Sequence, residues 1–131
     1  SLMATISAPV PHSDQKATYE GVMLERVLEA AHVQPGDPEK GTVLARPYRS
    51  AYVLIEAADG YQVVFSIPEV FANLGGQGVL LVDRQDGAPL TGKSAPYRIV
   101  VEHGTVYERW IRQVTRILVL PATPPAEGDR R

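Results

Sequence analysis

Short apolar runs that each end in a turn fill the second half of the chain, and they constrain its fold most. Residues 52–57 read Tyr-Val-Leu-Ile-Glu-Ala, an almost continuous apolar run that suits a central strand. Asp59 and Gly60 follow, and this pair favours a tight hairpin turn because glycine accepts the positive φ angle that the turn demands. We therefore expect a β-hairpin whose second strand covers residues 61–65.

The same alternation of strand and turn continues along the chain. Further strands are expected over residues 78–83, 97–101 and 115–120, with Asp86 and Gly87 forming another turn after the first of them. A chain of 131 residues has the length of one domain that can bury its own core. The sequence therefore predicts an α+β fold, a single mixed and β-rich domain with a few short helices.

Two short helices are expected between these strands. The first covers residues 23–31, where apolar side chains recur at the i, i+3, i+4 and i+7 positions of an amphipathic helix (Leu24, Val27, Leu28 and Ala31). The second begins at residues 66–69, where a serine, a proline and a glutamate have the order of a capped helix start. Glycines at positions 75 and 76 keep this second helix short.

The chain divides into three parts. Residues 1–17 are expected to form an N-terminal arm or edge strand, because Pro9 and Pro11 interrupt a β-prone stretch. An extended piece over residues 16–19 is expected to end at Gly21. The domain proper is expected over residues 18–120. A disordered tail rich in Pro, Ala, Glu and Gly is expected over residues 121–131, and the Ser1-Leu2 pair before the first methionine is expected to be a remnant of cloning.

Composition excludes several classes of function. Asp and Glu total 15 against 13 Lys and Arg, so a net charge of −2 gives no electrostatic basis for nucleic-acid binding. No apolar run reaches the roughly 18 residues of a membrane helix, so no membrane insertion is expected, and no export signal is visible. The chain has no cysteine, which excludes disulfides, zinc–thiolate sites and a thiol nucleophile.

The pattern of polar residues predicts neither a metal site nor a catalytic group. The three histidines, His12, His32 and His103, are scattered without the spacing of metal ligands. No phosphate-binding loop and no serine elbow is present. Three aspartates are expected to cap turns rather than to pair as acid and base (Asp59, Asp83 and Asp86).

Basic residues gather before the last strand. They lie within twenty residues, at strand ends and in loops (Lys93, Arg98, His103, Arg109 and Arg112). Arginines in such positions can bind a phosphate or a carboxylate with two hydrogen bonds. Spacing alone favours the simpler alternative, in which these side chains alternate along strands and face solvent. Trp110 is expected to be a core aromatic residue.

Five motifs in order resemble a known family. They are Tyr19-Glu20-Gly21-Val22-Met23-Leu24 with Val27-Leu28, Asp59-Gly60-Tyr61, Asp86-Gly87 with Pro89-Leu90, Ala95-Pro96 with Arg98-Ile99-Val100-Val101, and Arg109-Trp110-Ile111. Together they are similar to the molybdopterin-binding oxidoreductase domain of the sulfite oxidase superfamily, over roughly residues 18 to 120. That superfamily includes sulfite oxidases, plant-type nitrate reductases and a periplasmic methionine-sulfoxide reductase subunit. The chain most resembles its short bacterial members.

The resemblance implies an α+β domain with a cleft for a pterin cofactor. Carried over position by position, it implies that Arg98, His103 and Arg109 bind the cofactor. Arg109 stands where larger members usually have lysine, Glu102 where a proline is common, and Ser94 where a glycine is common. The resemblance also implies a periplasmic or exported protein.

Catalytic members of the family hold molybdenum through one cysteine, upstream of the glycine that matches Gly21. The corresponding stretch here, residues 6–13, has no cysteine, and a serine hydroxyl is a poor substitute for a thiolate ligand. The leading hypothesis is therefore a divergent, non-catalytic binding or accessory module with affinity for pterin or a small anion. One alternative is an oxidoreductase that holds its cofactor through the pterin alone or through Ser7, Ser13 or His12. Another is a structural subunit that docks on a redox partner.

Overall fold

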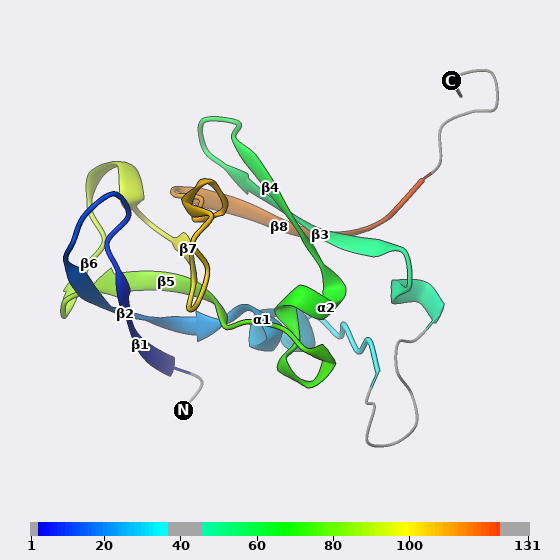
Figure 1. Ribbon diagram of the computed structural model, residues 1–131. Coiled ribbons are helices and arrows are strands. Elements are labelled where there is room, and N and C mark those ends of the chain that lie inside the picture. The colour runs from blue at the N-terminus through cyan, green and yellow to red at the C-terminus, as the bar shows by residue number, and fades with distance from the viewer. Residues whose placement is uncertain (1–2, 37–45, 124–131) are drawn as a thin grey trace.

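The computed structural model describes residues 3–36 and 46–123, whose strands form two antiparallel sheets (Figure 1). The larger sheet contains β1 (Met3–Pro9), β2 (Lys16–Met23), β5 (Val79–Gln85), β6 (Ala88–Pro89) and β7 (Arg98–Val101). The smaller sheet contains β3 (Ala51–Ala57), β4 (Gln62–Ser66) and β8 (Val114–Pro121), with β3 in the middle. In the larger sheet β2 pairs with one edge of β5, while β6 and β7 share its other edge.

Short helical segments connect the strands. The α-helices are α1 (Leu24–Ala30) and α2 (Ile67–Val70), and the 3₁₀ turns are η2 (Arg46–Tyr48), η3 (Ala72–Leu74), η4 (Gly92–Ser94) and η5 (Tyr107–Arg109). Both predicted helices are confirmed, and so is the α+β class. On α1, Leu24 and Leu28 are buried and Val27 is half-buried, whereas Ala31 lies past the helix end and is exposed.

The predicted β-hairpin is confirmed as β3 and β4. Its turn contains Gly60 at a φ of 90°. The carboxylate Oδ1 of Asp59 accepts a hydrogen bond from the backbone N–H of Tyr61 at 3.0 Å. The three further strands predicted from apolar runs correspond to β5, β7 and β8. Local sequence was sufficient for these elements because each turn is formed by its own residues.

The predicted capped start of the second helix is also present. The side chain of Ser66 accepts a hydrogen bond from the backbone N–H of Glu69, and the Glu69 carboxylate accepts one from the backbone N–H of Ser66 at 2.7 Å. This reciprocal pair is a capping box. It fixes the Glu69 carboxylate at the start of α2, a position that matters for the loop described below.

The expectation that Gly21 ends an extended piece is wrong. Strand β2 continues through Gly21 to Met23, with an irregular register between Glu20 and Gly21 where it pairs with β5. A Cβ atom at Gly21 would collide with the backbone carbonyl of Leu81. Glycine therefore serves here to let two strands approach closely, a requirement that depends on a partner about sixty positions away and not on local sequence.

The turns predicted at Asp86 and Asp83 have different outcomes. Asp86 lies in a turn as expected, where its Oδ1 accepts a hydrogen bond from the backbone N–H of Thr18 at 2.9 Å. The turn-capping prediction for Asp83 is wrong, because this residue lies within β5 and its Oδ1 is buried without a hydrogen-bond partner. Ser1, Leu2, residues 37–45 and the predicted tail from residue 124 onward lie outside the described residues.

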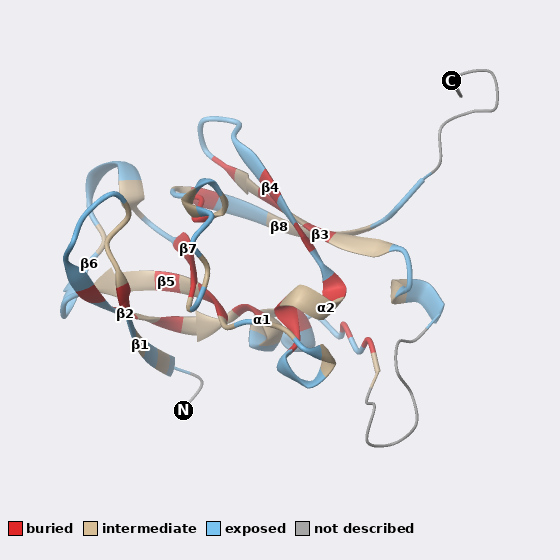
Figure 2. Cartoon of the chain, viewed as in Figure 1, coloured by how far each residue is buried: buried red, intermediate tan, exposed pale blue. Residues whose placement is uncertain are grey.

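One hydrophobic core joins the two sheets. Buried segments lie on β2, β3, β5 and β7 and on both helices (Figure 2). The largest fully buried side chains come from both sheets and both helices (Tyr19, Phe65, Leu24, Ile55, Ile67, Leu80 and Ile99). Strand β1 pairs with β2 along its whole length as an edge strand. Among the described residues no helix has the length and apolar character needed to cross a membrane.

Candidate functional site

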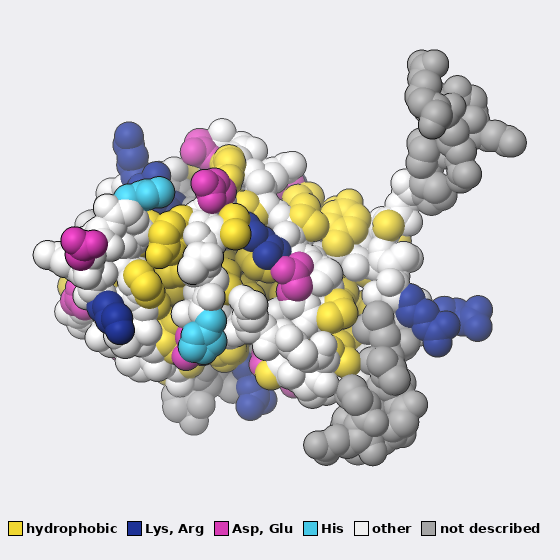
Figure 3. All heavy atoms as spheres, in the orientation of Figure 1, with side chains coloured by type: hydrophobic (Ala, Val, Ile, Leu, Met, Phe, Trp, Pro, Cys, Tyr) yellow, Lys and Arg dark blue, Asp and Glu magenta, His cyan; other side chains and the backbone are white. Residues whose placement is uncertain are grey.

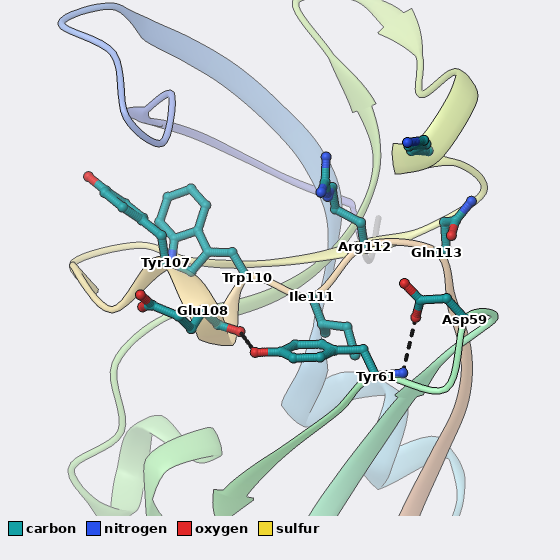
Figure 4. Close-up of a pocket in the computed structure, with 9 residues that line it drawn as sticks. Asp59, Tyr61, Tyr107, Glu108, Trp110, Ile111, Arg112 and Gln113 are labelled. Atoms are coloured by element: carbon teal, nitrogen blue, oxygen red, sulfur yellow. Dashed lines mark hydrogen bonds between the residues drawn. The ribbon is translucent and has the colours of Figure 1, made fainter.

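A pocket of about 310 Å³, called here the Trp110 pocket, lies beside the only tryptophan of the chain. Its walls come from the β3–β4 turn, from η4, and from η5 with the segment that leads into β8 (Figure 4). The residues that line it are Asp59, Tyr61, Lys93, Tyr107, Glu108, Trp110, Ile111, Arg112 and Gln113. The pocket thus lies where the smaller sheet meets the loops of the larger one.

Hydrogen bonds hold the wall formed by residues 107–113 in place. The hydroxyl of Tyr61 donates to the backbone carbonyl of Glu108 at 2.9 Å, which ties η5 to the β3–β4 turn (Figure 4). The backbone N–H of Ile99 donates to the carbonyl of Ile111 at 2.8 Å, which ties the same segment to β7. The wall is therefore attached to both sheets.

Charges of both signs surround the Trp110 pocket. Lys93 and Arg112 supply positive charge, and Asp59 and Glu108 supply carboxylates. One face of the molecule shows the same mixture, with acidic and basic side chains interspersed around a gathering of hydrophobic ones (Figure 3). Such a lining suits a ligand that carries both an anionic group and hydrogen-bond donors, rather than a simple polyanion.

Four aromatic rings run from the core to the tip of the β1–β2 hairpin. Trp110 makes edge-on contacts with Tyr19 and with Tyr107, at centroid distances of 6.1 Å and 5.0 Å. Tyr107 in turn makes an edge-on contact with His12 at 5.6 Å. The prediction that Trp110 is a core residue is confirmed, since only 3% of its surface is exposed. Its indole Nε1 is nevertheless buried without a hydrogen-bond partner.

Arg98 is a buried cation. Only 8% of its surface is exposed, its Nε has no hydrogen-bond partner, and no ion pair in the described part of the chain includes it. Burial lowers the pKa of Arg98; the nearby Tyr19 opposes this effect, and the charge of Arg112 adds to it. The expectation that these arginines face solvent is therefore wrong for Arg98, because all four residues of β7 are buried.

Arg109 has the opposite environment. Its guanidinium donates to both carboxylate oxygens of Glu69 at 2.7 and 3.2 Å and to the backbone carbonyl of Val64 at 2.8 Å. It also lies 3.9 Å from the ring centroid of Phe65. Hydrogen bonding to Arg109 holds the pKa of the Glu69 carboxyl below its usual range. We call these four residues the Arg109 corner.

The three residues that the family resemblance implies for cofactor binding are not brought together. Arg98 begins β7, whereas His103 lies past the other end of that strand, roughly 10 Å or more along it. The His103 side chain is 77% exposed, with its Nε2 4.0 Å from a carboxylate oxygen of Glu102. Arg109 lines a separate pocket of about 110 Å³. Two other residues of the predicted basic cluster, Lys93 and Arg112, do meet in the Trp110 pocket.

Sequence reasoning missed the aromatic and acidic parts of this site. Tyr107 and Tyr61 line the Trp110 pocket, and Tyr19 lies behind it against Trp110. Nothing in their spacing indicates a common site, because they come from a 3₁₀ turn, a hairpin and a strand of the other sheet. Asp59 was recognised only as a turn residue, although it also lines the pocket.

Comparison with known families identifies the domain. A model described as the oxidoreductase molybdopterin binding domain matches residues 7–127, from within β1 to beyond β8. The chain belongs to this family. Molybdopterin-binding oxidoreductase domains of this kind form the sulfite oxidase-type superfamily, so the resemblance found in the sequence motifs is confirmed. A search among curated proteins gives no match.

The residues of this molybdopterin-binding domain fit the pterin part of the family cofactor but not its molybdenum ion. The chain has no cysteine to ligate molybdenum, and no group of three His, Asp or Glu side chains in the described residues could hold a metal ion. Trp110, by contrast, lines the pocket, and its buried Nε1 has no hydrogen-bond partner in the described residues. The buried Nε of Arg98 also lacks one; Arg98 does not line the pocket, but its charge interacts with that of Arg112, which does. Lys93, Trp110 and Arg112 line the pocket and would hold the pterin and its anionic tail, and Arg98 would add positive charge close to Arg112.

Proposed function

We propose that this domain is a metal-free binding module for a pterin-type ligand, a flat nitrogen-rich ring that carries an anionic tail. It would act as an accessory component rather than as a catalyst. A ligand of this class combines a stacking surface, hydrogen-bond donors and negative charge. The Trp110 pocket offers a counterpart for each of these features.

The observation that carries the proposal is the buried side chain of Arg98, whose Nε has no hydrogen-bond partner in the described residues. Arginine keeps its charge in proteins, and burying a charge without a partner costs several kcal/mol in general. The charge of Arg112 has the same sign as that of Arg98 and adds to this cost. Arg98 does not line the Trp110 pocket, but Arg112 does, so an anion bound beside Arg112 would offset both charges, and the pocket favours a ligand with negative charge.

The pocket supports the remainder of the proposed ligand. Its volume of about 310 Å³ lies at the lower end of the range for small-molecule sites, roughly 300 to 1,000 Å³. Tyr61, Tyr107 and Trp110 provide aromatic surface for a flat ring. Asp59 keeps its second carboxylate oxygen available for ring N–H groups, because Oδ1 accepts from the Tyr61 N–H.

An oxidoreductase with a different metal ligand has less support. Ser7 is exposed on β1, and the hydroxyl oxygen of Ser13 accepts a hydrogen bond from the backbone N–H of Gln15 at 3.1 Å. The His12 ring packs against Tyr107. None of these side chains lines the Trp110 pocket. They therefore lie outside the place where the pterin would be held.

A structural subunit that docks on a redox partner remains a second candidate, and export remains a proposal that rests on the family alone. An open apolar groove lined by Leu81, Pro96, Tyr97, Val114 and Ile117 supports docking, with Tyr97 44% exposed. Nothing in the described residues indicates which partner would cover this groove. Pterin binding is therefore the function that the geometry supports best.

The decisive experiment is to express the chain in a host that makes the molybdenum cofactor, and to measure pterin and molybdenum per purified chain. We expect pterin without molybdenum. The matched variant Arg98→Met should lose the pterin, whereas Arg116→Met, on the exposed side of β8, should retain it. Molybdenum near one per chain would instead support the oxidoreductase. Absence of both pterin and metal would overturn the proposal and favour the docking subunit.

A further inference from the structure

We infer that Arg109 is a positioning residue that locks one wall of the Trp110 pocket, and that it does not contact the ligand. The family resemblance implies the opposite role for it, as a residue that binds the cofactor. This inference rests on the proposed function, because it concerns how the same pocket is built.

The guanidinium of Arg109 is already occupied. Three of its hydrogen bonds go to Glu69 and to the carbonyl of Val64, and its flat face covers the Phe65 ring. A guanidinium has five N–H donors, and here three of them already bond to a carboxylate and a carbonyl. Little hydrogen-bonding capacity is left for an anion. The adjacent Glu69 carboxylate would also repel one.

The position of Arg109 leads to the same conclusion. It lines the smaller pocket, together with Phe65, Glu69, Gly75, Gln77, Val79 and Val101, and it does not line the Trp110 pocket. Trp110 and Arg112, the next residues along the chain, do line the latter. Arg109 therefore contacts the smaller sheet from one side of the loop, while its sequence neighbours form the pocket wall on the other.

In the Arg109 corner, the groups that Arg109 contacts are themselves held in place by the smaller sheet and α2. Glu69 is held by the capping box at the start of α2, so the carboxylate is oriented before Arg109 reaches it. The hydrogen bond that Arg109 donates to the Val64 carbonyl places the guanidinium on β4, which is an edge strand of its sheet. Together with the Tyr61–Glu108 hydrogen bond, these contacts fasten η5 to the smaller sheet at two points.

Trp110 is the only tryptophan in the chain, so its fluorescence reports both ligand binding and the position of the loop. Two probes are titrated at several salt concentrations: pterin-6-carboxylate, and inorganic pyrophosphate as an anion without a ring. The variants are Arg98→Met, Arg109→Met, Arg109→Lys and Glu69→Gln, with Arg116→Met as the control. Affinity for a contacting cation falls with added salt, whereas a purely positioning role leaves the salt dependence unchanged.

For Arg98→Met we expect binding of both probes to weaken by about tenfold to a hundredfold, with a shallower salt dependence, because a positive charge close to the ligand's anionic group is lost. For Arg109→Met we expect a loss of about threefold to tenfold, an unchanged salt dependence and a red-shifted Trp110 emission. Arg109→Lys should recover part of the affinity, because an ammonium still pairs with Glu69 but cannot form the fork.

Glu69→Gln separates the two roles of Arg109. If Arg109 contacted the ligand, removing its carboxylate partner would free the guanidinium and tighten binding. We expect weaker binding instead, since the loop loses its anchor. Tighter binding by Glu69→Gln, or a shallower salt dependence in Arg109→Met, would overturn the inference. If the wild-type protein binds neither probe, the proposed function fails. An unchanged Trp110 emission in Arg109→Met would in that case also overturn the positioning role of Arg109.

Discussion

Two arginines near the ends of one short segment have opposite surroundings. Arg98 is buried on β7 without a hydrogen-bond partner for its Nε, and the charge of Arg112 acts against it. Arg109 is half-buried, yet it has a carboxylate, a carbonyl and an aromatic ring as partners. The charge of Arg98 therefore still needs a neutralising partner. The charge of Arg109 already has one within the protein.

The contrast separates a binding residue from a structural one. A satisfied arginine stabilises the fold that contains it, whereas an unsatisfied buried arginine destabilises the protein until an anion arrives. Both residues stand at positions for which the family resemblance implies the same role. Residue identity at a motif position therefore does not determine function here; the partners of each side chain do.

The largest effect should come from Arg98. Replacing it with methionine removes an uncompensated buried charge and keeps most of the side-chain volume, so the ligand-free protein should become more stable by about 2 kcal/mol. Urea denaturation at neutral pH measures this difference. Arg26→Met, at an exposed residue of α1 far from this cluster in sequence, should change stability by no more than about 0.5 kcal/mol. A loss of stability in Arg98→Met would mean that the guanidinium is satisfied in solution.

Glu69 is the carboxylate partner of Arg109, so its replacement tests how much this satisfied pair stabilises the fold. Its folded-state pKa lies below the ordinary value of 4.5, so its contribution to stability is present above that value and is lost as the pH falls through the folded pKa. At pH 7, Glu69→Gln should destabilise the protein by about 1 kcal/mol, because the partly exposed pair is screened by solvent but the capping box is also weakened.

The difference between wild type and Glu69→Gln should shrink as the pH falls below the ordinary value of 4.5 and through the lower folded-state pKa, until the carboxyl is protonated in both folded and unfolded states. Thermal or urea unfolding over a pH series measures it. The control is Glu29→Gln, at an exposed residue of α1, measured over the same pH series. A difference that persists unchanged at low pH would show that charge plays no part in the Arg109 corner.

The smallest effect is expected at Tyr61, the second point that fastens η5. Tyr61→Phe removes the hydroxyl that donates to the Glu108 carbonyl, at a cost of about 0.5 kcal/mol for one exposed hydrogen bond. Unfolding experiments would detect this loss, and Tyr97→Phe, at a similarly exposed tyrosine, is the control. Equal stability of the two variants would leave Arg109 as the main attachment of the loop.

Local elements were predictable, and long-range ones were not. The turn at Asp59-Gly60 and the capping box at Ser66 follow from neighbouring residues, so the sequence indicates them directly. The role of Gly21 depends on a strand that comes about sixty residues later. For the site, the cluster of basic residues was visible in sequence, but the burial of Arg98 and the pairing of Arg109 depend on how the two sheets pack.

Glu69 serves two structures with one side chain, and this has an evolutionary consequence. Its carboxylate completes the start of α2 and also receives the fork of Arg109. A substitution at position 69 therefore disturbs a helix and a distant loop in a single mutational step, and repairing only one of them leaves the other defective. Positions 66, 69 and 109 are expected to change together in descendants of this sequence or not at all.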